Sequence, residues 1–96
     1  MEIIFETIDK TSRKIRLTKK QWNHIKQDHP EVKDEEVIKE TLELPTKITK
    51  PYEGTKYYYY KYYKNRNPPD KCLMVVVNYL NGDGFVITAF YVSRIE

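Results

Sequence analysis

The sequence predicts a single α+β domain, in which N-terminal strands and two helices pack on a four-stranded antiparallel β-sheet. Three observations support this prediction. The chain has 96 residues, which are too few for two cores yet enough to fold without disulfides or metals. Two amphipathic helix patterns fall in the first half, and the segments after Pro45 have the composition of strands. With 40% hydrophobic residues, the chain has the composition of one folded domain over residues 1–96.

The N-terminal segment has the pattern of a hairpin followed by a helix. β-Branched and aromatic residues in 2–8 and alternation in 14–17 indicate two strands, which turn residues at 9–12 connect. Thr18 and Gln21 have the spacing of a capping box, in which each side chain bonds the backbone N–H of the other residue. The first helix is therefore expected to begin after Thr18.

Two prolines limit the helical part of the chain. Pro30 ends the first helix, because the residue before a proline is kept out of the helical region. Asp34 is a suitable N-cap for a second helix that ends before Pro45. The side chains expected on the buried stripe of this helix are Val37, Ile38, Thr41 and Leu42.

The second half of the sequence predicts a meander of strands. The most apolar segment, 72–79, is expected in the centre of the sheet. Asn81 to Gly84 has the residues of a hairpin turn, because Asn-Gly and Asp-Gly pairs tolerate positive φ. The complete set of expected strands is 47–50, 56–63, 72–79 and 85–92, with a surface loop at 64–71.

Charge is distributed in blocks, although the net charge is only +3. Residues 10–26 carry +7 with no acid, and residues 47–71 carry +5. If the two blocks meet on one face they attract a phosphate backbone; otherwise they are two solvated surfaces. A single cysteine, Cys72, and the lack of a signal-peptide or membrane pattern predict a cytoplasmic protein with no membrane partner.

Six of the nine tyrosines lie within residues 57–63. Alternation along a strand separates Tyr58, Tyr60 and Tyr62 from Tyr57, Tyr59, Lys61 and Tyr63. One set is expected to pack on the helices and the other to face outward. Outward rings and ammonium groups suit stacked bases and phosphates, whereas the alternative is simple cross-strand packing of tyrosines.

Both histidines lie on the first expected helix. A step of about 100° per residue places His24 on one flank with Gln21 and Asp28, whereas His29 follows the apolar stripe. His29 is either a core or helix-capping residue or a functional one. His24 is either an exposed residue without a role or a general acid–base group. Their spacing of five residues disfavours a shared ion, so no metal site is predicted.

A set of short segments spans residues 17–94: Leu17-Thr18, Trp22, His24-Ile25, His29-Pro30-Glu31, Thr41-Leu42, Pro45, the Tyr-rich strand, Val75-Val76-Val77 and Gly84 to Tyr91. Together they resemble a prokaryotic and phage-associated nuclease family that is grouped with barnase, EndoU, the tRNA-cleaving colicins and RelE. The resemblance implies helices followed by a four-stranded antiparallel sheet. It also implies RNA cleavage without metal or cofactor, in which the 2′-hydroxyl attacks the adjacent phosphate.

The resemblance further implies roles for individual residues. His24 and His29 are the expected acid–base pair, and Thr88 and Tyr91 are expected to contact the phosphate or the 2′-hydroxyl. The expected substrate-binding residues are Lys61, Arg94, Tyr59 and Lys20. The sequence departs from the family pattern at Asp28, where a basic residue is expected, and a carboxylate there opposes the approach of phosphate.

The implied substrate is RNA, either tRNA or ribosome-bound mRNA, and the implied protein partner is an antitoxin-like chain. Two other functions fit the same residues. One is a non-catalytic RNA-binding module that uses the tyrosine face, and the other is a protein-interaction domain in which exposed aromatic side chains contact protein.

Overall fold

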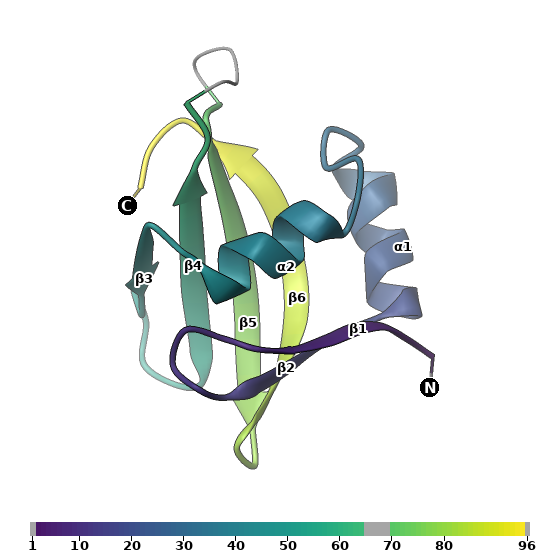
Figure 1. Ribbon diagram of the computed structural model, residues 1–96, viewed down its shortest axis with the longest axis vertical. Coiled ribbons are helices and arrows are strands. Elements are labelled where there is room, and N and C mark those ends of the chain that lie inside the picture. The colour runs from purple at the N-terminus through teal and green to yellow at the C-terminus, as the bar shows by residue number, and fades with distance from the viewer. Residues whose placement is uncertain (1, 65–69, 96) are drawn as a thin grey trace.

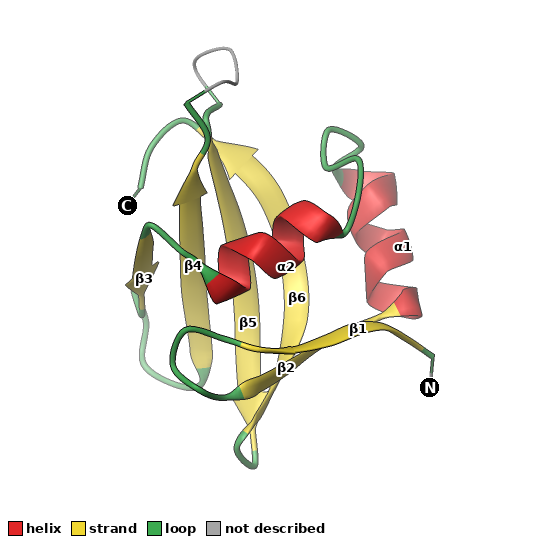
Figure 2. Ribbon diagram, in the orientation of Figure 1, coloured by secondary structure: helices red, strands yellow, loops and turns green. Residues whose placement is uncertain are grey.

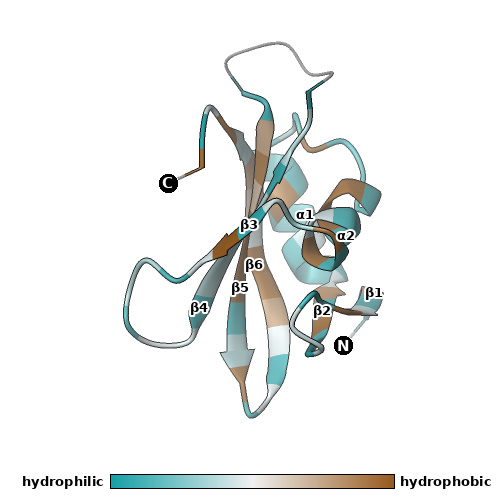
Figure 3. Ribbon diagram, turned by 60° about the vertical axis from the view of Figure 1, so that its left-hand side comes forward, coloured by the Kyte–Doolittle hydropathy of each residue, from teal (hydrophilic) through white to brown (hydrophobic). Residues whose placement is uncertain are grey.

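A six-stranded mixed sheet carries two helices on one of its faces (Figures 1 and 3). The structure is a computed structural model that describes residues 2–64 and 70–95. The strand order is β1-β2-β6-β5-β4-β3. In chain order the elements are β1 (Ile3–Ile8), β2 (Lys14–Thr18), α1 (Lys19–Asp28), α2 (Glu36–Glu43), β3 (Lys47–Thr49), β4 (Lys56–Tyr62), β5 (Cys72–Leu80) and β6 (Asp83–Val92) (Figure 2).

The predicted four-stranded antiparallel sheet was wrong. The β1–β2 hairpin joins the sheet, and β2 runs parallel to β6 through the pairs Ile15–Gly84 and Arg16–Phe85. The other neighbouring strands are antiparallel. The parallel contact joins segments far apart in the chain, so no local pattern marks it. Of the predicted loop at 64–71, residues 65–69 lie outside the described residues.

The helix ends agree with the capping signals only in part. Thr18 Oγ1 accepts a hydrogen bond from the Gln21 backbone N–H at 3.2 Å, as predicted. The Gln21 side chain does not close the capping box, because its amide donates to the Ile87 carbonyl on β6. Asp34 Oδ1 accepts from the backbone N–H groups of Glu36 at 3.0 Å and Val37 at 3.3 Å, so it caps α2 as expected.

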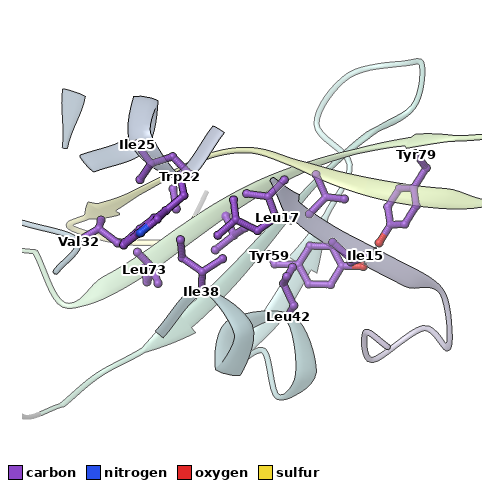
Figure 4. Close-up of a cluster of buried hydrophobic side chains, with 14 residues drawn as sticks. Ile15, Leu17, Trp22, Ile25, Val32, Ile38, Leu42, Tyr59, Leu73 and Tyr79 are labelled. Carbon is purple, nitrogen blue, oxygen red and sulfur yellow. Dashed lines mark hydrogen bonds between the residues drawn. The ribbon is translucent and has the colours of Figure 1, made fainter. Parts of the chain in front are cut away.

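The main core lies between the helices, the hairpin and one face of the sheet (Figure 4). Trp22 and Ile25 from α1 and Ile38 and Leu42 from α2 are buried there. Full burial of a large apolar side chain of this kind contributes about 1.5–3 kcal/mol to stability. The sheet supplies the facing side chains Ile15, Leu17, Tyr59, Leu73, Val75, Val77, Tyr79, Val86 and Ala89.

A buried carboxylate connects the hairpin turn to the sheet. Asp9 Oδ2 accepts hydrogen bonds from the hydroxyls of Tyr59 on β4 and Tyr79 on β5. Its Oδ1 accepts from the backbone N–H groups of Thr11 and Arg13, each at 2.9 Å. The Arg13 guanidinium carbon lies 3.6 Å from the centre of the Tyr79 ring. Figure 4 shows the Tyr59 and Tyr79 hydroxyls pointing toward each other.

This cluster shifts the protonation of its members. Burial opposes the charged form of Asp9, but hydrogen bonds from Tyr59, Tyr79, Arg13 and Thr11 outweigh it and lower the pKa of the carboxyl. Burial, together with the bond to Asp9, raises the pKa of Tyr59 to about 12. Burial and the same carboxylate raise the pKa of Tyr79 as well. The folded state therefore favours an ionised Asp9 beside neutral tyrosines.

The first prediction concerns stability against pH. In the unfolded chain Asp9 takes up a proton near pH 4, above its folded pKa. The free energy of unfolding is therefore expected to fall as the pH drops below about 4. It is also expected to fall as the pH rises from about 10 towards the Tyr59 pKa of about 12. Urea unfolding across pH measures both limbs.

Asp9→Asn should lower the free energy of unfolding at pH 7 by roughly 1–3 kcal/mol and reduce the acid limb, because it removes the charged acceptor. Glu53→Gln, at an exposed position, is the control. An Asp9→Asn variant with the wild-type acid limb would contradict this assignment.

The second prediction concerns Gly84, where β2 meets β6. A Cβ at this position would lie 2.8 Å from Tyr79 Cε1 and 3.0 Å from Cγ1 of both Ile15 and Val77. Gly84→Ala should therefore lower the free energy of unfolding by about 1–3 kcal/mol through overpacking. Ser93→Ala, at an exposed position, should leave the urea midpoint unchanged. Equal urea midpoints for the two variants would show that the β2–β6 contact accommodates the added methyl group without loss of stability.

Candidate functional site

The candidate site lies where β2 and β6 separate. Beyond Phe85, β6 has no strand partner on this side in the described part of the chain, and α1 lies beside it (Figure 1). The β5–β6 register shifts here, since Val76 pairs with Thr88 but Val77 pairs with Val86. Ile87 is thus the extra residue of a β-bulge, a feature that re-aims backbone and side chains. Gln21 of α1 donates to its carbonyl.

A pocket of about 330 Å³ opens between α1 and the bulge. Its walls are Gln21, His24, Ile25 and Asp28 from α1 and Ile87 and Thr88 from β6. His24 and Asp28 are one helical turn apart and share a side of α1, a spacing at which a carboxylate can orient an imidazole. The pocket therefore combines a proton acceptor, a carboxylate and a hydroxyl donor. The predicted flank of Gln21, His24 and Asp28 is confirmed.

His29 lies next to this pocket and does not line it. Its ring stacks on Phe90 with centroids 4.7 Å apart and an interplanar angle of 24°. Its backbone N–H donates to the Ile25 carbonyl at 2.7 Å, and its Nδ1 lies 3.8 Å from Glu31 Oε2. Phe90 and Thr88 are two residues apart on one strand face, which is about 7 Å along β6, so His29 stacks on the strand one face position beyond Thr88.

The sheet separates three expected site residues from the pocket. Tyr59 is fully buried, and its hydroxyl donates to Asp9, so it cannot contact a substrate. Lys61 Nζ donates to the Leu44 carbonyl at 3.0 Å. Tyr91 packs against the helix-side core. Strand alternation places all three on the face opposite Thr88.

The remaining two expected residues are exposed cations. Lys20 lies on α1 one turn before His24, and it lines a neighbouring hollow of about 630 Å³ with Glu2, Thr18, Lys19 and Asn23. Arg94 follows β6 and is exposed. The structure therefore groups His24 and Thr88 in one pocket, His29 beside it, and Lys20 on the same side of α1.

Two residues of this region were not expected. Phe90 supports His29, and Ile87 fixes α1 through its carbonyl. Phe90 belongs to a regular alternating pattern along the last strand, and that pattern gives no sign of a histidine neighbour. The bulge at Ile87 changes the register by one residue, and alternation alone cannot locate such an insertion.

Comparison with models of protein families, with curated proteins and with solved structures gives no match for this chain. Within residues 2–64 and 70–95, no helix has the length and apolar character needed to span a membrane. In the same part of the chain, no three His, Cys, Asp or Glu side chains gather in a group that could hold a metal ion.

The third prediction concerns the bond that holds α1 against β6. Gln21→Met keeps the length of the side chain but leaves the Ile87 carbonyl without its donor. The free energy of unfolding should fall by about 1 kcal/mol, and the amides of residues 86–88 should exchange faster with deuterium. Gln27→Met on the same helix, at an exposed position, is the matched control. Unchanged exchange in Gln21→Met would show that this bond does not position the helix.

Proposed function

We propose that the pocket between α1 and β6 cleaves RNA without a metal, as the resemblance to the barnase, EndoU, colicin and RelE group implies. The observation that carries the proposal is that His24 of α1 and Thr88 of β6 line one pocket. These two side chains come from segments far apart in the chain. They combine the proton acceptor and the hydroxyl donor that attack by a 2′-hydroxyl requires.

In the proposed reaction, His24 accepts the proton of the 2′-hydroxyl. The 2′-oxygen forms a bond to the adjacent phosphorus, the bond from phosphorus to the 5′-oxygen breaks, and a 2′,3′-cyclic phosphate remains. His29, whose ring lies against Phe90 two residues after Thr88, donates a proton to the departing 5′-oxygen. Its stack on Phe90 holds the ring in place for this step.

Two further groups stabilise the charge of the transition state. The Thr88 hydroxyl donates a hydrogen bond to a phosphate oxygen, and Lys20 supplies positive charge from one turn before His24. Such groups lower the barrier because the pentavalent phosphate carries more negative charge than the substrate. Asp28, one helical turn after His24, orients the His24 ring.

RNA binding without cleavage is a second candidate function, and the position of Asp28 favours it. A carboxylate in the wall of the pocket repels a phosphate. Asp28→Asn separates the two functions. If Asp28 orients His24, the substitution slows cleavage. If Asp28 only repels phosphate, the substitution strengthens RNA binding, and no cleavage is found in either protein. An antitoxin-like partner stays a prediction.

The fourth prediction is RNA cleavage in the presence of EDTA. Incubation of the protein with tRNA or a fluorogenic RNA should give products that end in a 2′,3′-cyclic phosphate. His24→Ala should lower the rate by about 100-fold or more, the usual contribution of a general acid–base group. Thr88→Val should lower it by about 100-fold through loss of one donor to the transition state.

The matched control for this assay is Gln27→Met, which changes an exposed side chain on the same helix. Circular dichroism should show that all variants retain the fold. Absence of product with the wild-type protein, or equal rates for wild type and the His24→Ala and His29→Ala double variant, would exclude the proposed reaction.

A further inference from the structure

The sheet has a second face, on the side away from the helices (Figure 3). Rows of side chains cross this face from β3 to the candidate site on β6. Register pairing places four residues in one row across β3, β4, β5 and β6, namely Thr49, Tyr58, Val76 and Thr88. The adjacent row consists of Lys47, Tyr60, Met74 and Phe90. One row therefore ends at the pocket and the other at the His29 stack. Both rows begin at β3.

A slot of about 190 Å³ lies at the β3 end of these rows. Its lining is largely aromatic and apolar, and its side-chain polar groups are the hydroxyls of Thr49 and of three tyrosines: Thr49, Pro51, Tyr52, Tyr58, Tyr60 and Met74. The rings of Tyr52 and Tyr58 meet edge to face, with centroids 6.5 Å apart. Tyr52 is 71% exposed, so one wall of the slot is a ring at the surface.

The Thr49 hydroxyl in this slot is buried, and its Oγ1 lacks a hydrogen-bond partner among the described residues. A buried, unpaired hydroxyl is unfavourable by about 1–3 kcal/mol on the scale of protein mutations. A ligand with a polar edge would supply the missing bond. The slot thus combines ring surfaces with an unpaired hydroxyl, which are the contacts that a nucleobase makes.

The charge around the slot indicates what else the ligand carries. Lys47 of β3 lies in the second row, and Lys56 of β4 precedes Tyr58 by two residues on the same face. Both lysines are exposed, and neither β3 nor β4 contains an acidic residue. An anionic backbone beside the slot is therefore favoured, whereas an apolar protein segment would gain nothing from these charges.

We infer that the slot holds one unstacked base of a single-stranded RNA whose backbone crosses the sheet face towards Thr88. This inference rests on the proposed function, because it assigns the second contact of the same substrate. Tyr58 and Thr88 are two strands apart, which is about 10 Å. A short extended stretch of RNA spans that distance. Single-stranded RNA is the substrate class that fits, because a paired and stacked base cannot enter the slot.

The fifth prediction tests the slot by binding. A fluorescently labelled single-stranded RNA and its duplex are titrated at low salt against the whole protein carrying His24→Ala, which slows cleavage. The single strand should bind more tightly than the duplex. Tyr52→Ala should weaken binding by about fivefold to 150-fold, the range for loss of one base–aromatic stack.

Thr49→Val should also weaken binding, although it should leave stability equal or higher because it removes an unpaired hydroxyl. The matched control is Tyr62→Ala, since Tyr62 lies on the same strand and face, is 51% exposed, and does not line the slot. It should bind RNA as the parent protein does. These results together would support the base slot.

Several results would overturn the inference. These are equal affinity for single strand and duplex, unchanged affinity in both Tyr52→Ala and Thr49→Val, or no binding of labelled RNA at low salt. The absence of RNA binding would instead favour a protein segment as the ligand of the slot.

Failure of the slot is distinguishable from failure of the proposed reaction. If the wild-type protein does not cleave RNA but Tyr52→Ala weakens binding, the base slot stands without the reaction. If the wild-type protein cleaves RNA and Tyr52→Ala cleaves subsaturating RNA equally fast, the reaction stands without the slot.

Discussion

The carboxylate of Asp9 connects the N-terminal hairpin to the rest of the sheet. It accepts hydrogen bonds from tyrosines on β4 and β5 while it also closes the turn between β1 and β2. With the turn held there, β2 reaches β6 at Gly84, and α1 continues from β2 along the free side of β6. The position of the pocket therefore depends on a polar contact on the far side of the core.

Local rules predicted the parts of the site that lie on one helix. The 100° step placed Gln21, His24 and Asp28 on one flank, and the structure places all three in the pocket. The Thr18 and Asp34 caps follow from short-range hydrogen bonding in the same way. These features depend on residues within one or two turns of each other, so the sequence contains enough information to locate them.

Long-range features could not be predicted. The parallel pairing of β2 with β6 joins residues separated by most of the chain, and the bulge at Ile87 shifts the strand by one residue. The tyrosine strand shows the same limit. Alternation sorted its side chains into two sets, but tertiary packing decides which set is covered. Tyr59 and Lys61 fall on the helix side, whereas Tyr58 and Tyr60 lie on the opposite face, where they pack with Met74.

The strand β3 has a consequence for association between chains. It is an edge of the sheet, and an edge strand presents free backbone groups to which another chain can add. Here the edge is only three residues long, it carries Lys47, and Pro45 and Pro51 flank it. A short, charged strand between prolines resists strand addition and aggregation.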